Sequence, residues 1–169
     1  SRPAQVRQFA AALMSNRTPG KMNIPDEVAE PAFRSHIQDL DERNIDFQLV
    51  GPRPVDQWHW MPFYLQEVWA RATNDHIAQS VRMHPDRFVG MAHLPQNAKL
   101  DTRSCVKELE RCVKELGFVG GYLNPDPGGD RSAPGVHEPY WFPLYEKAIQ
   151  LDVPLLVHRH PQHFGQAWQ

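Results

Sequence analysis

Two spacings of apolar residues alternate along the chain from residue 31 onward. Stretches with an apolar side chain at every third or fourth position predict amphipathic helices, at residues 31–44, 64–84, 101–116 and 139–151. Short runs that are apolar at successive positions predict strands, at residues 46–50, 88–94, 118–123 and 153–157. Strands that are apolar on both faces are typical of a parallel sheet covered by helices.

The predicted helices carry boundary signals. Pro31 stands where a helix can begin, Asp101 can cap another helix, and Gly117 supplies the stop of that helix. Residues 1–30 are weakly patterned and interrupted by prolines and glycine, so we interpret them as a loop or insertion. Residues 31–169 carry the repeating α/β units, and the whole chain is interpreted as one domain.

Consecutive strand ends lie about 30–45 residues apart, which is typical of β/α units with right-handed crossovers. A doubly wound open sheet and a closed barrel both have this repeat. A doubly wound nucleotide-binding sheet needs a glycine-rich turn after a strand, whereas Gly117, Gly120 and Gly121 precede a strand or lie inside one. Polar residues at the carboxyl ends of the strands favour the barrel. Because eight strands need about 250 residues, we predict a partial (β/α)8 TIM barrel.

Composition and charge restrict the classes of partner. The 169 residues carry a formal net charge of −2, which leaves no basic surface for nucleic acid. No apolar run approaches the ~20 residues that span a bilayer, and residues 1–16 lack the features of a signal peptide. We therefore expect a soluble cytoplasmic protein that binds neither nucleic acid nor a membrane.

The two cysteines, Cys105 and Cys112, fall on the same predicted helix. At this separation their Cα atoms are about 10 Å apart, whereas a disulfide needs them within about 7 Å. The thiols are therefore predicted to be free and buried, in agreement with a reducing compartment.

His158 closes the last apolar run and is the main candidate for a metal ligand. At the carboxyl end of a buried strand its imidazole would point into the mouth of a barrel, although a hydrogen-bonded turn histidine has the same signature. His160 follows two positions later, a spacing that puts both rings on one face of a strand. Because Pro161 comes next, the strand can have ended, so His160 stays a weaker candidate as a ligand or catalytic group.

Four further candidates lie at or after strand ends. Arg53 could hold a substrate carboxylate with its planar fork, although most loop arginines only solvate a surface. His59 lies in the aromatic loop 58–61 and is a candidate proton donor, unless this loop only packs over the next helix. His93 and Asn124 end the second and third strands and are candidates for substrate binding, although Asn124 can equally cap its turn.

An ordered series of motifs extends from residue 46 to residue 158. The motifs are Asn74-Asp75, segment 84–90 (HPDRFVG), Leu94-Pro95, segments 108–113 and 115–120, and the strand 153–158. This series resembles the amidohydrolase-related metalloenzymes, a group that includes aminocarboxymuconate-semialdehyde decarboxylase and 4-oxalomesaconate hydratase. Segments 123–127 and 140–147 are closer to the hydratase branch.

The resemblance implies a (β/α)8 barrel that holds one divalent metal, usually zinc. The family's ligands are an HxH pair on the first strand, a histidine on the fifth and an acidic residue on the eighth. His158 matches the fifth-strand histidine, so the predicted strands are about the second to the fifth, and the other ligands are expected outside residues 1–169. After that histidine the decarboxylases have proline and tryptophan, whereas this chain has Arg159 and His160.

The activity implied by the resemblance is that of a metal-dependent lyase. It would hydrate or decarboxylate a small carboxylated intermediate of aromatic-compound breakdown, with Arg53 holding a carboxylate. The alternatives are a metal-dependent hydrolase of a lactone or amide and a non-catalytic fragment. The 169 residues alone are expected to be inactive, because one imidazole does not hold a metal tightly. Dimers are common in the family, so a homodimer is the implied assembly, although nothing in the sequence specifies an interface.

Overall fold

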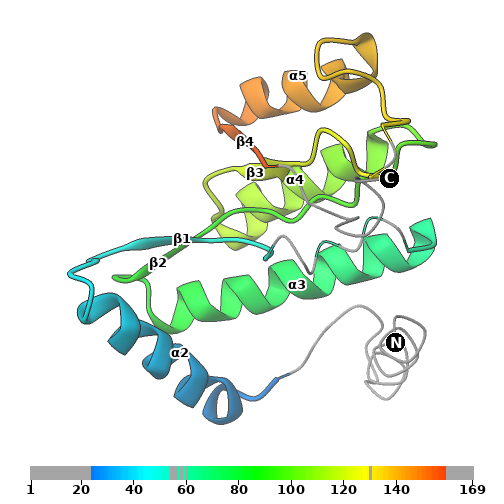
Figure 1. Ribbon diagram of the computed structural model, residues 1–169. Helices are drawn as coiled ribbons and strands as arrows, with labels where there is room; N and C mark the ends of the chain where they lie inside the picture. The colour runs from blue at the N-terminus through cyan, green and yellow to red at the C-terminus, as the bar shows by residue number, and fades with distance from the viewer. Residues whose placement is uncertain (1–23, 54–56, 58, 60, 130, 159–169) are drawn as a thin grey trace, which may run out of the picture.

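Four short parallel strands form the centre of the computed structural model, which describes residues 24–53, 57, 59, 61–129 and 131–158. The strands are β1 (Gln48–Val50), β2 (Phe88–Gly90), β3 (Gly121–Leu123) and β4 (Leu155–Val157). β1 pairs with β2, β3 pairs with β4, and a parallel bridge between Ala92 and Gly121 joins the two pairs. The strands are therefore neighbours in the order of the sequence (Figure 1).

A helix precedes each of these strands. They are α2 (Asp26–Asp41), α3 (Phe63–Met83), α4 (Arg103–Leu116) and α5 (Phe142–Leu151), and the short 3₁₀ helix η2 (Pro139–Trp141) leads into α5. In Figure 1, α3 runs along β1 and β2, and α5 lies beyond β4. A doubly wound sheet reverses its strand order at a switch point. The described strands show no such reversal, and the predicted partial (β/α)8 barrel is confirmed.

The two faces of the sheet differ in burial. Phe88 and Leu123 are buried in the layer between the strands and the helices, where they join Leu109, Trp141 and Leu144 in the core. On the opposite face, Leu49 is 47% exposed and Leu156 is 43% exposed. Because strand side chains alternate between the faces, this second face is the one that lines the interior of a closed barrel.

The sequence placed the helices correctly except for the start of the first one. α2 begins at Asp26, so the predicted start at Pro31 is wrong and residues 26–30 are helical rather than a loop. Pro31 lies inside α2, where it removes one backbone donor on an exposed side of the helix. The strands are shorter than predicted. Phe118, for example, packs into the core from backbone that precedes β3.

The C-terminal end of α4 follows the predicted chemistry, whereas the N-terminal end does not. Gly117 ends the helix in the left-handed conformation with φ 71°, and the N–H of Phe118 donates to the carbonyl of Cys112 at 3.0 Å. The predicted cap at the other end is wrong, because the N-cap residue is Thr102, which makes no side-chain cap hydrogen bond. Asp101 lies one residue earlier and accepts the N–H of Arg103 at 3.0 Å. The helix itself begins at Arg103.

Both cysteines are free and buried, as predicted, with Cys105 2% exposed and Cys112 fully covered. Burial raises the pKa of the Cys105 thiol to about 12 and also raises the pKa of Cys112. Both thiols are therefore protonated at neutral pH. No helix among the described residues is long and apolar enough to cross a membrane.

Candidate active site

The carboxyl ends of the parallel strands form a rim on which several predicted site residues lie. His93 follows β2 by three residues, while Asn124 and His158 come directly after β3 and β4. The backbone N–H of His158 donates to the carbonyl of Leu123 at 2.9 Å, which joins the ends of these last two strands. We call His59, His93, Asn124 and His158 the rim residues.

His59 reaches the rim from the loop after β1 and is 4% exposed. Its Nδ1 lies 3.1 Å from the amide nitrogen of Asn124, and its Nε2 lies 3.2 Å from the carbonyl of Leu94. The oxygen of the Asn124 amide accepts the N–H of Asp126, so the amide nitrogen must donate to His59 Nδ1. His59 Nε2 therefore carries the proton that it donates to Leu94, and both ring nitrogens are engaged. The proton-donor role of His59 stays a prediction.

His93 is 2% exposed, and its ring centroid lies 5.7 Å from that of His59. Burial is the main cause that lowers the pKa of His93 to about 3, the nearby His59 acts in the same direction, and a hydrogen bond with the backbone of Gln57 opposes both. The imidazole is therefore neutral at physiological pH. Its buried Nδ1 has no hydrogen-bond partner among the described residues.

His158 presents a second buried and unpartnered Nδ1 in the described part of the chain. Its ring lies 6.2 Å from the ring of Tyr122 in an edge-to-face arrangement. A buried imidazole nitrogen without a partner suits the first coordination sphere of a divalent metal. Among the described residues, no group of three or more histidine, cysteine, aspartate or glutamate side chains could hold a metal. The role of His158 as a metal ligand therefore stays a prediction.

Two buried amide side chains hold the rim backbone, and sequence reasoning missed both as site residues. The side chain of Asn74 on α3 accepts the N–H of His93 at 2.7 Å and donates to its carbonyl at 2.9 Å. The side chain of Gln96 likewise accepts the backbone N–H of Asn124 at 2.9 Å and donates to its carbonyl at 2.8 Å. Asn74 could have been found as an amide on the buried side of α3, whereas Gln96 lies in a loop and had no such signal.

Tyr122 is a third residue that the sequence did not single out. It belongs to the face of β3 opposite the helices, and its ring covers Gly51, where a Cβ atom would collide with Tyr122. Burial raises the pKa of the Tyr122 phenol above its ordinary value. Glycine at position 51 is thus what allows an aromatic side chain to lie between the end of β1 and His158.

Arg53 does not lie among the rim residues. Arg53 is exposed and lines a cavity of about 360 Å³ together with Phe33 of α2 and Trp69 of α3. No contact between Arg53 and the rim residues follows from this position, so its role as a carboxylate anchor stays a prediction. His160 lies outside the described residues.

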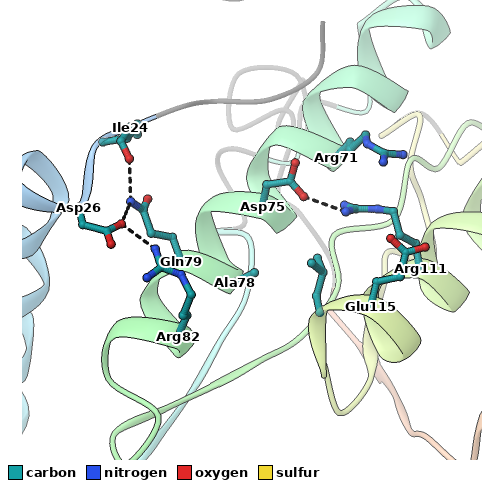
Figure 2. A pocket seen from close by; sticks show the side chains of 10 residues that line it. Ile24, Asp26, Arg71, Asp75, Ala78, Gln79, Arg82, Arg111 and Glu115 are labelled. Atoms are coloured by element: carbon teal, nitrogen blue, oxygen red, sulfur yellow. Dashed lines mark hydrogen bonds and ion pairs between the residues drawn. The ribbon is translucent and has the colours of Figure 1, made fainter. Parts of the chain in front are cut away.

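A polar cleft of about 700 Å³ opens on the outer side of the helices, away from the rim (Figure 2). Arg82 pairs with Asp26 at 2.6 Å on one side of it, and Arg111 pairs with Asp75 at 2.8 Å on the other. Because these cations and anions neutralise one another and the cleft has no rim residue in its lining, the rim is the better candidate for catalysis.

A parallel β/α sheet with polar residues at the carboxyl ends of its strands is typical of the (β/α)-barrel enzymes. The amidohydrolase family model matches residues 36–168, and the chain belongs to this family. The 2-keto-4-carboxy-3-hexenedioate hydratase of Sphingobium sp. (strain NBRC 103272 / SYK-6) is 39% identical over 141 residues, which cover 79% of this chain and 40% of the hydratase.

Solved structures agree with this assignment. The crystal structure of 4-oxalomesaconate hydratase from Rhodopseudomonas palustris superimposes with a TM-score of 0.79 at 31% identity, over 92% of this chain and 47% of the hydratase. The dihydroxybenzoic acid decarboxylase of Polaromonas sp. JS666, which contains bound manganese and an inhibitor, matches with a TM-score of 0.54 at 30% identity, over 80% of this chain and 43% of the decarboxylase. The chain thus spans less than half the length of these relatives.

Proposed function

We propose that the intact protein is a metal-dependent lyase that adds water to a small unsaturated polycarboxylate from aromatic-compound breakdown. The observation that carries this proposal is the buried, unpartnered Nδ1 of His158 at the carboxyl end of β4. The hydratase assignment is supported by the relative that is 39% identical and by the TM-score of 0.79 to a second hydratase. Decarboxylation is the second candidate, because decarboxylases are also among the relatives.

His158 would hold a divalent metal, either zinc or manganese, together with ligands from outside the described residues. When bound, such a metal polarises a substrate oxygen and stabilises enolate-like charge. While neutral, His93 would accept a hydrogen bond from a substrate hydroxyl through its Nδ1. Asn124 and His59, locked to each other, would form a fixed wall beside the substrate.

Metal content of the intact protein tests the proposal. We expect a bound divalent metal, and we expect His158→Ala to lose about 10-fold or more in metal affinity together with its turnover. His137→Ala is the matched control, because His137 is an exposed loop histidine. Mass spectrometry of the metal checks the first result. A His158→Ala protein with full metal and unchanged turnover would contradict the proposal.

Product analysis separates the two lyase reactions. A hydratase removes the absorbance of a conjugated dienoate without releasing carbon dioxide, whereas a decarboxylase releases the gas. Hydrolysis of a lactone or amide is a third outcome and would appear as acid release from those substrates. Each reaction is read directly from the purified intact protein.

A further inference from the structure

A charged cluster between α3 and α4 lies directly behind the rim. Arg111 holds Glu108 with two bonds, Nε to Oε2 at 3.0 Å and Nη2 to Oε1 at 2.7 Å, and its Nη1 reaches Asp75 at 2.8 Å. The side chains of Arg111, Glu108 and Asp75 are only 10%, 11% and 18% exposed. Figure 2 shows the Asp75–Arg111 arm of this cluster. Bidentate geometry and burial together fix the position of the Glu108 carboxylate.

The Glu108 carboxylate in turn orients Asn74. Glu108 Oε1 accepts the Nδ2 of Asn74 at 2.8 Å, and Asn74 is completely buried. A flipped amide would place the Asn74 oxygen against this carboxylate, so Nδ2 must face Glu108 and Oδ1 must face the other way. This is the orientation in which Oδ1 accepts the N–H of His93 and Nδ2 donates to the His93 carbonyl.

The backbone of His93 depends on this amide because the β2 ladder has already ended. The last backbone hydrogen bonds to neighbouring strands are made by Met91 and Ala92. Met91 bonds to Val50, and Ala92 bonds to Gly120 and Tyr122. His93 lies one residue beyond them, and Asn74 takes the place of a neighbouring strand for both its N–H and its carbonyl. A helix side chain therefore sets where the His93 ring lies.

We propose that Arg111, Glu108 and Asn74 form a positioning relay that fixes His93 at the rim for the reaction. None of the three reaches the rim interior, so they act through His93. The inference rests on the proposed function for the step in which His93 contacts substrate. The hydrogen bonds by which Asn74 fixes the His93 backbone do not depend on any activity.

Two Glu108 variants of the intact protein test the relay. Glu108→Ala removes the acceptor that orients Asn74, whereas Glu108→Gln keeps an oxygen that can accept from Asn74 Nδ2. Glu110→Ala is the matched control, since Glu110 lies on the same helix and pairs with Lys114 at the surface. Amide hydrogen exchange at His93 reports the hold on the backbone, and steady-state kinetics report the consequence for catalysis.

We expect Glu108→Ala to speed exchange at the His93 amide and to lower kcat about tenfold with KM nearly unchanged. Glu108→Gln should restore both, and Glu110→Ala should match the parent. Unchanged exchange at His93, or an unchanged kcat in an active Glu108→Ala protein, would overturn the relay. If the parent itself has no lyase turnover, the proposed function fails, and the exchange result still decides whether the relay holds His93.

Discussion

The rim and the charged cluster behind it both bury polar side chains, but they differ in charge. The rim is built from imidazoles and amides, and burial keeps His93 neutral with a pKa of about 3. The cluster between α3 and α4 concentrates formal charge on Arg111, Glu108 and Asp75. Asn74 links the two regions, with bonds to Glu108 and to the His93 backbone.

This difference shows that the residues that fix the geometry lie apart from the residues that are candidates for the reaction. Charges buried between helices fix geometry, because one guanidinium, Arg111, binds two carboxylates at once. At the rim, the imidazole nitrogens of His93 and His158 have no partner among the described residues, and the proposed metal and anionic substrate would bring the charge with them. If the comparison is correct, removing a charge should lower the free energy of unfolding most in the cluster. A change of pH should alter it mainly through the rim.

Removing the cation of the cluster should have the largest effect on stability. Arg111→Met leaves Glu108 and Asp75 buried without their partner, which should cost about 3 kcal/mol of unfolding free energy. Urea unfolding of the intact protein measures this loss. Arg103→Met is the control, because the Arg103–Asp101 pair is 84% and 55% exposed and should contribute little. Equal midpoints for the two variants would refute the distinction between buried and exposed charge.

Acid should act through His93. Its pKa is about 6.5 when unfolded and about 3 when folded. Below pH 6.5 the His93 imidazole is protonated in the unfolded chain but stays neutral in the folded chain. Stability therefore falls as the pH drops from 6.5 towards 3. One such histidine removes about 2 kcal/mol between pH 7 and pH 5. His93→Gln should flatten this slope relative to His137→Gln in unfolding measurements across that range, and a parent-like slope would disprove it.

The smallest effect is expected from the side-chain amide that joins two rim residues. Asn124→Ala removes the donor to His59 Nδ1 and the acceptor of the Asp126 N–H, which should cost about 1 kcal/mol. Asn97→Ala is the control, since the Asn97 side chain accepts the N–H of exposed Lys99. Thermal unfolding compares the two. A loss for Asn124→Ala as large as that for Arg111→Met would show that the rim, too, carries a large share of the stability.

Much of the fold could be predicted because apolar periodicity is a local property. The spacing that buries Leu109 against the sheet also identifies α4, and Gly117 marks its end through a backbone conformation that favours glycine. The start of α2 was misplaced because a proline signal was given more weight than the acidic first turn, Asp26 and Glu27, that lies ahead of it.

The candidate site was predictable only in part. A histidine after an apolar run, such as His158, can be found from the sequence because strand ends share one edge of a parallel sheet. The orientation of a side chain depends on partners far away in the chain, and no local pattern contains them. His59 meets Asn124 across 65 positions, and Asn74 meets Glu108 across 34.

The order of helices and strands, the free thiols and the place of His158 at a strand end can be derived from the sequence, because these follow from residue type and spacing. Which polar groups are neutral, which are paired and which are left without a partner is a property of the folded protein. Those properties arise from burial and from contacts between distant segments. The bonds of Asn74 to the His93 backbone, and the pairing of Arg111 with Glu108 behind it, belong to this second kind.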